Sequence, residues 1–371
     1  MFRERPIGRG KRPDYVLLIT TLILVSFGTV MIYSSSSIIA TMGKSGDGYF
    51  YLKKQLFFFV VGLAAMLALC RIPYEYFKRF AYPGVAVSLV LLLVLFIPRL
   101  GVKVGGATRW LNLGFFTFQV TELVKIALIL FLAHFLTKNN AQIRELRTGL
   151  LMPLTVTAVF LGLIMLQPDF GTAGIVAVVL VCMLFLAGSR IMHLSAMVGV
   201  LVPVAVWLVM HKRYRMERIF GFFDPWKDAQ KSGFQIIQSF ISFGSGGTFG
   251  VGLGDGMQKL FYLPEPHTDF ILSVIAEESG FIGVAAVIIL FLVFVFRGFI
   301  IAFKAPDLFG TLLAAGLTTL IATEALINIA VVMALVPTKG LVLPFLSYGG
   351  SSLIMSMAAV GMLLSISTAR K

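Results

Sequence analysis

The chain has 371 residues, of which 58% are hydrophobic and 13% charged, with a formal net charge of +14. Soluble domains carry about 25% charged residues, so this composition excludes a soluble globular protein and indicates a polytopic membrane protein. We expect no nucleic-acid partner, because basic loops beside anionic lipid headgroups account for the positive charge. Cys70 and Cys182 lie inside apolar runs and predict neither a disulfide nor a metal site.

A transmembrane helix needs about 20 apolar residues to cross roughly 30 Å of hydrocarbon, and ten apolar segments have about this length. The sequence therefore predicts an all-α fold, a bundle of ten transmembrane helices in a single domain spanning residues 1–371. The predicted spans are roughly 15–34, 53–71, 81–98, 117–136, 149–167, 170–188, 191–210, 269–303, 308–336 and 341–366.

The basic segment 1–14 has no cleavage site after the first apolar run, which predicts a retained cytoplasmic tail. Ten spans place both termini on one side, and the Lys and Arg residues of short loops on that side predict that it is cytoplasmic. We expect a cytoplasmic (inner) membrane protein whose long loop, residues 211–268, is extracytoplasmic.

That loop begins with a basic stretch containing Arg213, Arg215 and Arg218. Phe234, Ile237 and Ile241 follow at helical spacing, which predicts a short helix on the membrane surface. The glycines of GSGGTFGVGLGDG follow no predicted strand, so a flexible outer loop is expected rather than a nucleotide site.

Two polar clusters occur near the predicted outer ends of spans. Glu122 and Lys125 are three residues apart on one helix face, where they form either a structural ion pair or part of a substrate cavity. Asp169, in the turn QPDFGT, either caps the following helix or belongs to the site.

A third cluster lies in the stretch FYLPEPHTDFILSVIAEESG. Glu265 is expected to be a turn residue between two prolines, and His267 to orient its neighbours. Asp269 is either a helix cap or a catalytic carboxylate where water meets hydrocarbon. The run 269–303 is long for one span and is expected to tilt, break or protrude.

The fourth cluster, LPFLSYGGSS, opens the last predicted span. Its glycines and hydroxyls allow either close approach to an anionic or sugar ligand or close helix packing. Glu324 and Asn328 are expected to make hydrogen bonds between helices. Carboxylates, cations such as Arg109 and aromatic residues such as Trp110, Tyr262 and Tyr348 together suit a lipid-linked anionic sugar.

The motifs QPDFGT, PEPHTDFI with AEESGFIG, and PFLSYGGSS, in this order over the whole chain, resemble the SEDS family of peptidoglycan glycosyltransferases. GVGLGDGMQKLFYLPE and VPTKGLVLPFLSYGG are similar to the division branch, FtsW and its sporulation relative, more than to RodA. One departure is Val120-Thr121, where the family usually has Pro-Ser, so this chain lacks the proline before Glu122 and keeps a hydroxyl at Thr121.

The resemblance implies polymerisation of lipid II outside the cytoplasmic membrane, with a class B penicillin-binding transpeptidase and other division proteins as partners. It implies that Asp269 is the catalytic residue. Implied or expected substrate-binding residues are Glu122, Lys125, Asp169, Arg109, Trp110, His267, Ser347, Tyr348, Gly349, Gly350, Ser351, Arg213 and Arg215. In such a reaction undecaprenyl diphosphate is the leaving group, and its negative charge requires positive charge nearby. The basic residues among these, or a divalent cation such as Mg²⁺ near Asp169 or Glu122, could supply it. No organic cofactor is expected. A lipid II flippase and a scaffold of the division complex are the alternative functions.

Overall fold

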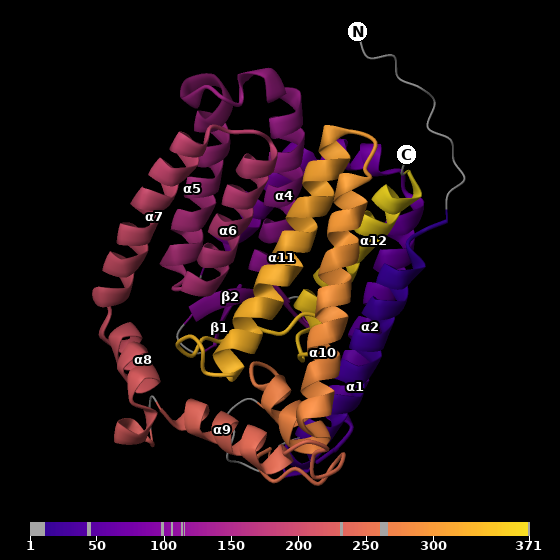
Figure 1. Cartoon of the computed structure of the whole chain (residues 1–371), viewed down its shortest axis with the longest axis vertical. Helices are drawn as coiled ribbons and strands as arrows, with labels where there is room; N and C mark the ends of the chain where they lie inside the picture. Colours follow the sequence, from indigo (N-terminus) through magenta and orange to yellow (C-terminus); the bar gives the residue numbers. More distant parts are fainter. Residues whose placement is uncertain are drawn as a thin grey trace.

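The computed structural model describes residues 12–42, 46–97, 100–104, 107–112, 114, 116–230, 233–259 and 266–369. Helices run along the long axis of the protein, with a small sheet and two surface helices at one end (Figure 1). At the other end the first and last helices meet, where the Asp14 amide donates a hydrogen bond to Ser367 Oγ (3.0 Å). The start and finish of the described chain therefore lie on the same side of the bundle.

The long apolar sequences form helices because a chain in hydrocarbon must satisfy its own backbone hydrogen bonds. Nine helices in the described ranges are long and apolar enough to cross a membrane; α6, with 17 residues, is a shorter apolar helix. The ten predicted spans coincide with ten helices, which confirms the nearly all-α, polytopic fold. They are α1 (Tyr15–Met42), α2 (Phe50–Arg71), α3 (Ala81–Val94, after the 3₁₀ helix η1, Tyr74–Phe80), α4 (Val120–Lys138), α5 (Leu151–Leu166, after η3, Leu146–Leu150), α6 (Phe170–Leu186), α7 (Ile191–Met210), α10 (Ile271–Phe303), α11 (Leu308–Val332) and α12 (Gly350–Thr368).

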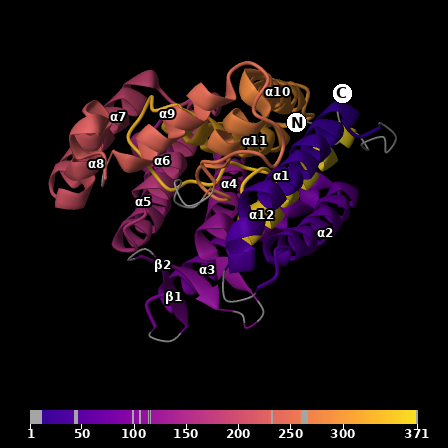
Figure 2. The same cartoon turned by 90° about the horizontal axis from the view of Figure 1, so that it is seen from below.

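Burial separates central helices from peripheral ones. In α4 and α12, 83% of the most apolar window is buried within the protein, against 6% in α7. Seen from the end that carries the sheet, α7 and α8 (Arg213–Phe223) lie at one edge of the bundle, and α1 and α2 lie at the other (Figure 2). Side chains on α4, α11 and α12 therefore face other helices, so any charge on these faces requires a protein partner.

A three-stranded antiparallel sheet, which the sequence analysis did not predict, precedes α4. Its strands are β1 (Gly101–Val104), β2 (Ala107–Asn112) and β3 (Thr117–Gln119), and Trp110 pairs with Gln119 across β2 and β3. The predicted start of the fourth span at Thr117 is therefore wrong, because residues 117–119 pair with β2 and the helix begins at Val120.

The last helix also begins later than predicted, at Gly350 instead of residue 341. Phe345 has a φ of +68°, which a helix cannot accommodate. The Leu343 amide donates to Ser347 Oγ (2.8 Å) and the Tyr348 amide to the His267 carbonyl (2.8 Å). These contacts hold residues 343–349 as a turn against the segment that precedes α10.

The long loop between α7 and α10 is largely ordered structure. It forms α8, the short 3₁₀ helix η4 (Pro225–Asp228) and α9 (Phe234–Gly246), which confirms a helix over the predicted surface segment. Ile236 and Ile237 are buried whereas Phe240 and Ile241 are exposed, so α9 has one packed and one open face. Another short 3₁₀ helix, η2 (Asn140–Gln142), connects α4 to η3.

The expectation that the glycine-rich sequence after α9 is a flexible loop is wrong. We call residues 246–259 the glycine loop. A Cβ on Gly246 would lie 1.9 Å from the Ala276 carbonyl oxygen, and one on Gly250 would lie 2.2 Å from that of Glu278. The glycines let this loop pack directly on the backbone of α10.

The long helix α10 is broken at Gly280, as the excess length of the predicted span suggested. Gly280 has φ +65° and ψ −162°, values that lie outside the helical region and favour glycine. The residues before the break, Ile271–Ser279, form a separate short helix that begins two residues after Asp269, and we call this the half-helix.

Candidate functional site

Asp169 forms a corner between the sheet and the start of α6. Its carboxylate accepts hydrogen bonds from the Thr172 amide (3.2 Å) and hydroxyl (2.8 Å), which confirms the predicted cap. Arg109 on β2 lies beside it, with Nε 3.6 Å from Asp169 Oδ2 and Nη2 donating to the Pro168 carbonyl (3.0 Å). The sheet thus brings a guanidinium to the N-terminus of α6.

Lys125 connects two central helices through a buried group of three charges. Its ammonium lies 2.8 Å from Glu122 on the same helix, so the predicted pairing is confirmed. It also contacts Glu324 on α11, which confirms that Glu324 bonds between helices. All three side chains are 5–6% exposed. Two carboxylates share one ammonium here, so the group carries a formal charge of −1.

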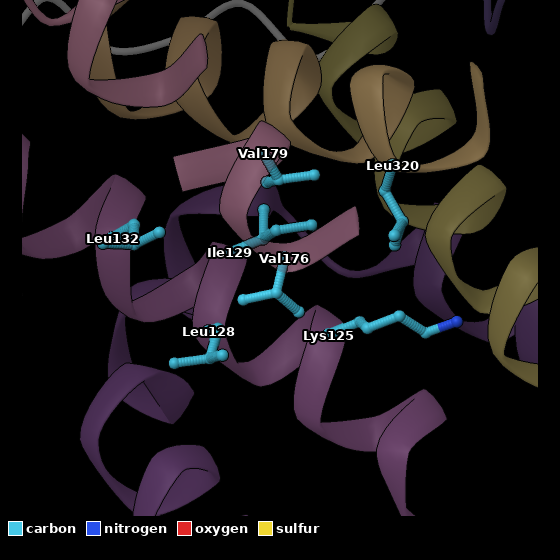
Figure 3. Close-up of a pocket in the computed structure, with 7 residues that line it drawn as sticks. All are labelled: Lys125, Leu128, Ile129, Leu132, Val176, Val179 and Leu320. Carbon is cyan, nitrogen blue, oxygen red and sulfur yellow. The ribbon is translucent and has the colours of Figure 1, made fainter. Parts of the chain in front are cut away.

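The pocket beside Lys125 is small. It is lined by Lys125, Leu128, Ile129, Leu132, Val176, Val179 and Leu320 and has a volume of about 10 Å³. Figure 3 shows the Lys125 side chain extending away from these aliphatic residues. That volume suits about one water molecule and not a sugar. In this conformation Lys125 is a structural partner of two carboxylates.

Asp269 lies at the junction of the half-helix, α11 and the connection between α11 and α12. Asn328 Nδ2 donates to the Asp269 carbonyl (3.0 Å) and to the Leu341 carbonyl (2.5 Å). A Cβ on Gly340 would lie 2.7 Å from Asp269 Oδ2. The N-cap of α10 is Phe270 rather than Asp269, one residue later than the cap that the sequence allowed.

The predicted serine–glycine turn packs against the residues before Asp269. The ring of Tyr51 on α2 lies 4.6 Å from that of His267 and 5.2 Å from that of Tyr348, measured between centroids. Burial raises the pKa of Tyr348 to about 12, so its hydroxyl stays protonated and can donate but not act as a base.

The two ends of this turn make close contacts with neighbouring elements. Ser351 Oγ accepts from the Gln119 amide (3.0 Å), which joins α12 to β3. A Cβ on Gly350 would lie 2.4 Å from the Phe58 ring, whereas one on Gly349 would make only ordinary contacts. The close helix packing that the sequence allowed therefore applies to Gly350.

Lys339 is a candidate site residue that the sequence analysis did not select. Its Nζ lies 4.8 Å from the centre of the Phe170 ring, and the Arg215 guanidinium lies 5.3 Å from the same ring. Arg218 donates to the Thr338 carbonyl (3.3 Å). Burial lowers the pKa of Lys339 to about 8; Asp169 opposes this shift, and Arg109, Arg215 and Arg218 add to it. The only signal in the sequence was a single Lys in VPTKG, indistinguishable from a solvated loop residue.

We call Arg109, Arg215, Arg218 and Lys339 the cation cluster. Arg109 lies beside Asp169, and Asp169 and the three arginines are all close enough to Lys339 to influence its pKa. Arg213 does not belong to it: its side chain is 94% exposed and pairs with Glu217 (3.1 Å). The exposure of Arg213 follows from the helical geometry of α8, because residues two apart point in different directions. Trp110 lies on β2 and is half-buried, while Tyr262 and Glu265 lie outside the described residues.

The divalent cation expected near Asp169 or Glu122 stays a prediction; as the side chains stand, both carboxylates contact protein groups. Asp169 is engaged by Thr172 and Arg109, and Glu122 by Lys125. Within the described ranges there is no group of three or more His, Cys, Asp or Glu side chains that could hold a metal ion. We therefore assign no step to a metal and consider the fixed cations as the source of positive charge.

Comparison with known proteins places the chain in a family. Residues 15–371 match the family model described as cell cycle protein, FTSW_RODA_SPOVE. The chain is 50% identical over 358 residues to a probable peptidoglycan glycosyltransferase FtsW of Trichlorobacter lovleyi, covering 96% of this chain and 94% of that protein. It is 41% identical to stage V sporulation protein E of Bacillus subtilis, covering 96% and 97%.

Solved structures give the same result for the fold. One chain, from work on the structural coordination of polymerization and crosslinking by a peptidoglycan synthase complex, matches with a TM-score of 0.78 and 30% identity over 96% of this chain and 97% of that one. The rod shape determining protein RodA of Thermus thermophilus matches with a TM-score of 0.69 and 27% identity over 96% and 97%. The chain is a multi-pass membrane protein that belongs to the family of FtsW, RodA and stage V sporulation protein E.

Proposed function

We propose that the protein is a peptidoglycan glycosyltransferase that polymerises lipid II during septal wall synthesis. The single observation that carries this proposal is the placement of two chain neighbours. Lys339 of the cation cluster lies with its Nζ 4.8 Å from the centre of the Phe170 ring, whereas a Cβ on Gly340 would lie 2.7 Å from Asp269 Oδ2. Consecutive Cα atoms are about 3.8 Å apart. A carboxylate base and a diphosphate-binding charge are thus within reach of one sugar phosphate.

In the proposed reaction Asp269 takes the proton from the 4-hydroxyl of the acceptor GlcNAc. The hydroxyl oxygen forms a bond to C1 of the donor MurNAc while the bond from C1 to the diphosphate oxygen breaks. Undecaprenyl diphosphate leaves with that electron pair. A single displacement converts the α-linked donor into a β-1,4 bond by inversion. The cation cluster stabilises the negative charge on the leaving diphosphate.

The similarity to proteins named FtsW supports a role in division, and the similarity to a sporulation protein keeps spore formation as the other setting. A class B penicillin-binding transpeptidase is the proposed partner, since a similar solved chain comes from a complex that couples polymerization with crosslinking. Other division proteins are proposed to join this pair. We place both termini in the cytoplasm and the site at the outer face, because the site lies at the end of the bundle opposite the contact between α1 and α12 (Figure 1).

The test is glycan synthesis by the full chain in lipid vesicles supplied with lipid II, with and without a class B penicillin-binding protein. Asp269→Asn should abolish polymer formation and retain lipid II binding, because only the proton acceptor changes. Asp47→Asn, at an exposed ion pair with Lys53 outside the proposed site, is the matched control and should remain active. Continued glycan synthesis by Asp269→Asn would overturn the assignment of Asp269 as the catalytic base. Movement of lipid II between leaflets without polymer formation would favour the alternative function, a flippase. The buried charges on α4 and α11 are also compatible with that function.

A further inference from the structure

The half-helix is held at both ends by contacts from distant parts of the chain. Asp269 lies two residues before its first residue; Asn328 donates to the Asp269 carbonyl, and a Cβ on Gly340 would lie 2.7 Å from the Asp269 carboxylate. The opposite end stops at Gly280, where a Cβ would lie 2.4 Å from the Gly250 amide nitrogen. The half-helix is about 14 Å long at 1.5 Å per residue. Because it is short and interrupted, its position depends on what binds its second end.

The glycine loop binds that second end through the backbone. The amides of Val251 and Gly252 donate to the carbonyls of Glu277 (3.0 Å) and Glu278 (3.1 Å). Beyond the break, the Phe281 amide donates to the Gly247 carbonyl (2.9 Å). These bonds use backbone groups that the interrupted helix leaves without partners in its own ladder. The loop therefore replaces the missing turn of α10.

A buried charge pair closes the same contact. The Lys259 ammonium lies 2.6 Å from Glu278 Oε1, and their side chains are 3% and 0% exposed. Lys259 also donates to the Gly254 carbonyl (2.7 Å) and to Ser34 Oγ on α1 (3.1 Å). Ser34 in turn donates to Glu278 (2.6 Å). All three protons of the ammonium thus have acceptors within the protein.

Such a pair is a poor source of stability. Removing two charges from water costs several kcal/mol per ion, and apolar side chains of similar volume often serve as well or better. A buried pair does fix one geometry, because each charge requires its partner. Here the geometry so fixed is that of the glycine loop and α1 against the half-helix.

We propose that Lys259, acting through Glu278, is a positioning residue for the Asp269 carboxylate. Lys259 and Ser34 hold the second end of the half-helix, and the rigid helix transmits that position to its first end. This inference rests on the catalytic role proposed above for Asp269. Displacement of a reacting group by about 1 Å can lower a rate by about 100-fold, so a small shift of the half-helix is sufficient.

The test uses the double variant Lys259→Met with Glu278→Gln, which removes both charges and leaves neither one buried alone. Lys259→Arg is the conservative variant and keeps the positive charge. Lys53→Met is the matched control, since Lys53 forms an ion pair with Asp47 in which its side chain is 69% exposed. Polymerisation of lipid II in vesicles gives kcat and KM, and hydrogen exchange reports on amides 271–279.

The double variant should lose about 10- to 100-fold in kcat with little change in KM, because substrate still binds while the base is misplaced. Amides 271–279 should exchange faster, Lys259→Arg should recover most of the rate, and Lys53→Met should match the wild type. An unchanged kcat with unchanged exchange would overturn the proposal, and so would a loss that only follows the fraction of unfolded protein. If Asp269→Asn still polymerises, the catalytic role proposed for Asp269 fails, while the exchange of amides 271–279 still tests whether the glycine loop holds the half-helix.

Discussion

Asn328 on α11 donates a hydrogen bond to the backbone carbonyl of Asp269 at 3.0 Å. The same amide group donates to the Leu341 carbonyl, so one side chain binds both Asp269 and the connection between α11 and α12. Glu324 lies one turn earlier on α11 and contacts Lys125. A single face of α11 therefore joins the buried charges to the proposed base.

Asn328→Leu should lower kcat strongly and destabilise the protein by about 1 to 3 kcal/mol, because two carbonyls lose their donor. KM should change less, since neither carbonyl is a proposed substrate contact. Thermal unfolding and lipid II polymerisation measure the two effects. Asn139→Leu is the comparison, because the Asn139 side chain donates to the Phe135 carbonyl at the end of α4 (3.1 Å), away from Asp269. Equal losses in both variants would contradict a specific role for Asn328.

The arginines of α8 offer a matched pair. Arg215 lies 5.3 Å from the centre of the Phe170 ring and donates to the Leu208 carbonyl (2.7 Å), whereas Arg213 points into solvent. Arg215→Gln should raise KM for lipid II several-fold, because the cluster loses one charge near the diphosphate. Arg213→Gln should leave KM unchanged. The same titration of lipid II on both variants decides this, and a common rise in KM would mean that α8 acts through its net charge alone.

The buried charges on α4 and α11 predict an asymmetric response. Lys125→Met leaves two carboxylates buried without their cation, which should destabilise the protein by about 3 kcal/mol or more. Glu324→Gln keeps the pair of Lys125 with Glu122 and should cost much less. Thermal unfolding in detergent compares the two. A larger loss for Glu324→Gln than for Lys125→Met would contradict this account of the three charges.

The features that the sequence predicted correctly depend on neighbours in the chain. Apolar runs became helices because the membrane leaves the backbone no other partner. Glu122 and Lys125 pair because residues three apart share a helix face, and Asp169 caps α6 through Thr172, three residues away. Each of these follows from local geometry.

The features that were missed depend on distant partners. The start of α4 was misplaced because β3 pairs with β2, and that of α12 because its preceding turn bonds to His267. Glu324 was expected to bond between helices, but nothing local identified Lys125, 199 residues away, as its partner. Lys339 gains its environment from α6 and α8, so its sequence neighbours carried no sign of the cation cluster.

The lowered pKa of Lys339 predicts a dependence on pH that arginine should remove. Burial sets this pKa at about 8, below the usual 10.5. Below pH 8 the ammonium carries its charge and can hold diphosphate; as pH rises through 8 the charge is lost, so KM for lipid II should increase between about pH 7 and pH 9. The stability of the folded protein should also rise from about pH 8 to pH 10.5. Over this range Lys339 has lost its proton in the folded protein but still binds it in the unfolded chain. Lys339→Arg keeps its charge throughout and should flatten the KM profile. Measurement of KM against pH for both proteins tests this, and identical profiles would show that Lys339 does not hold the diphosphate.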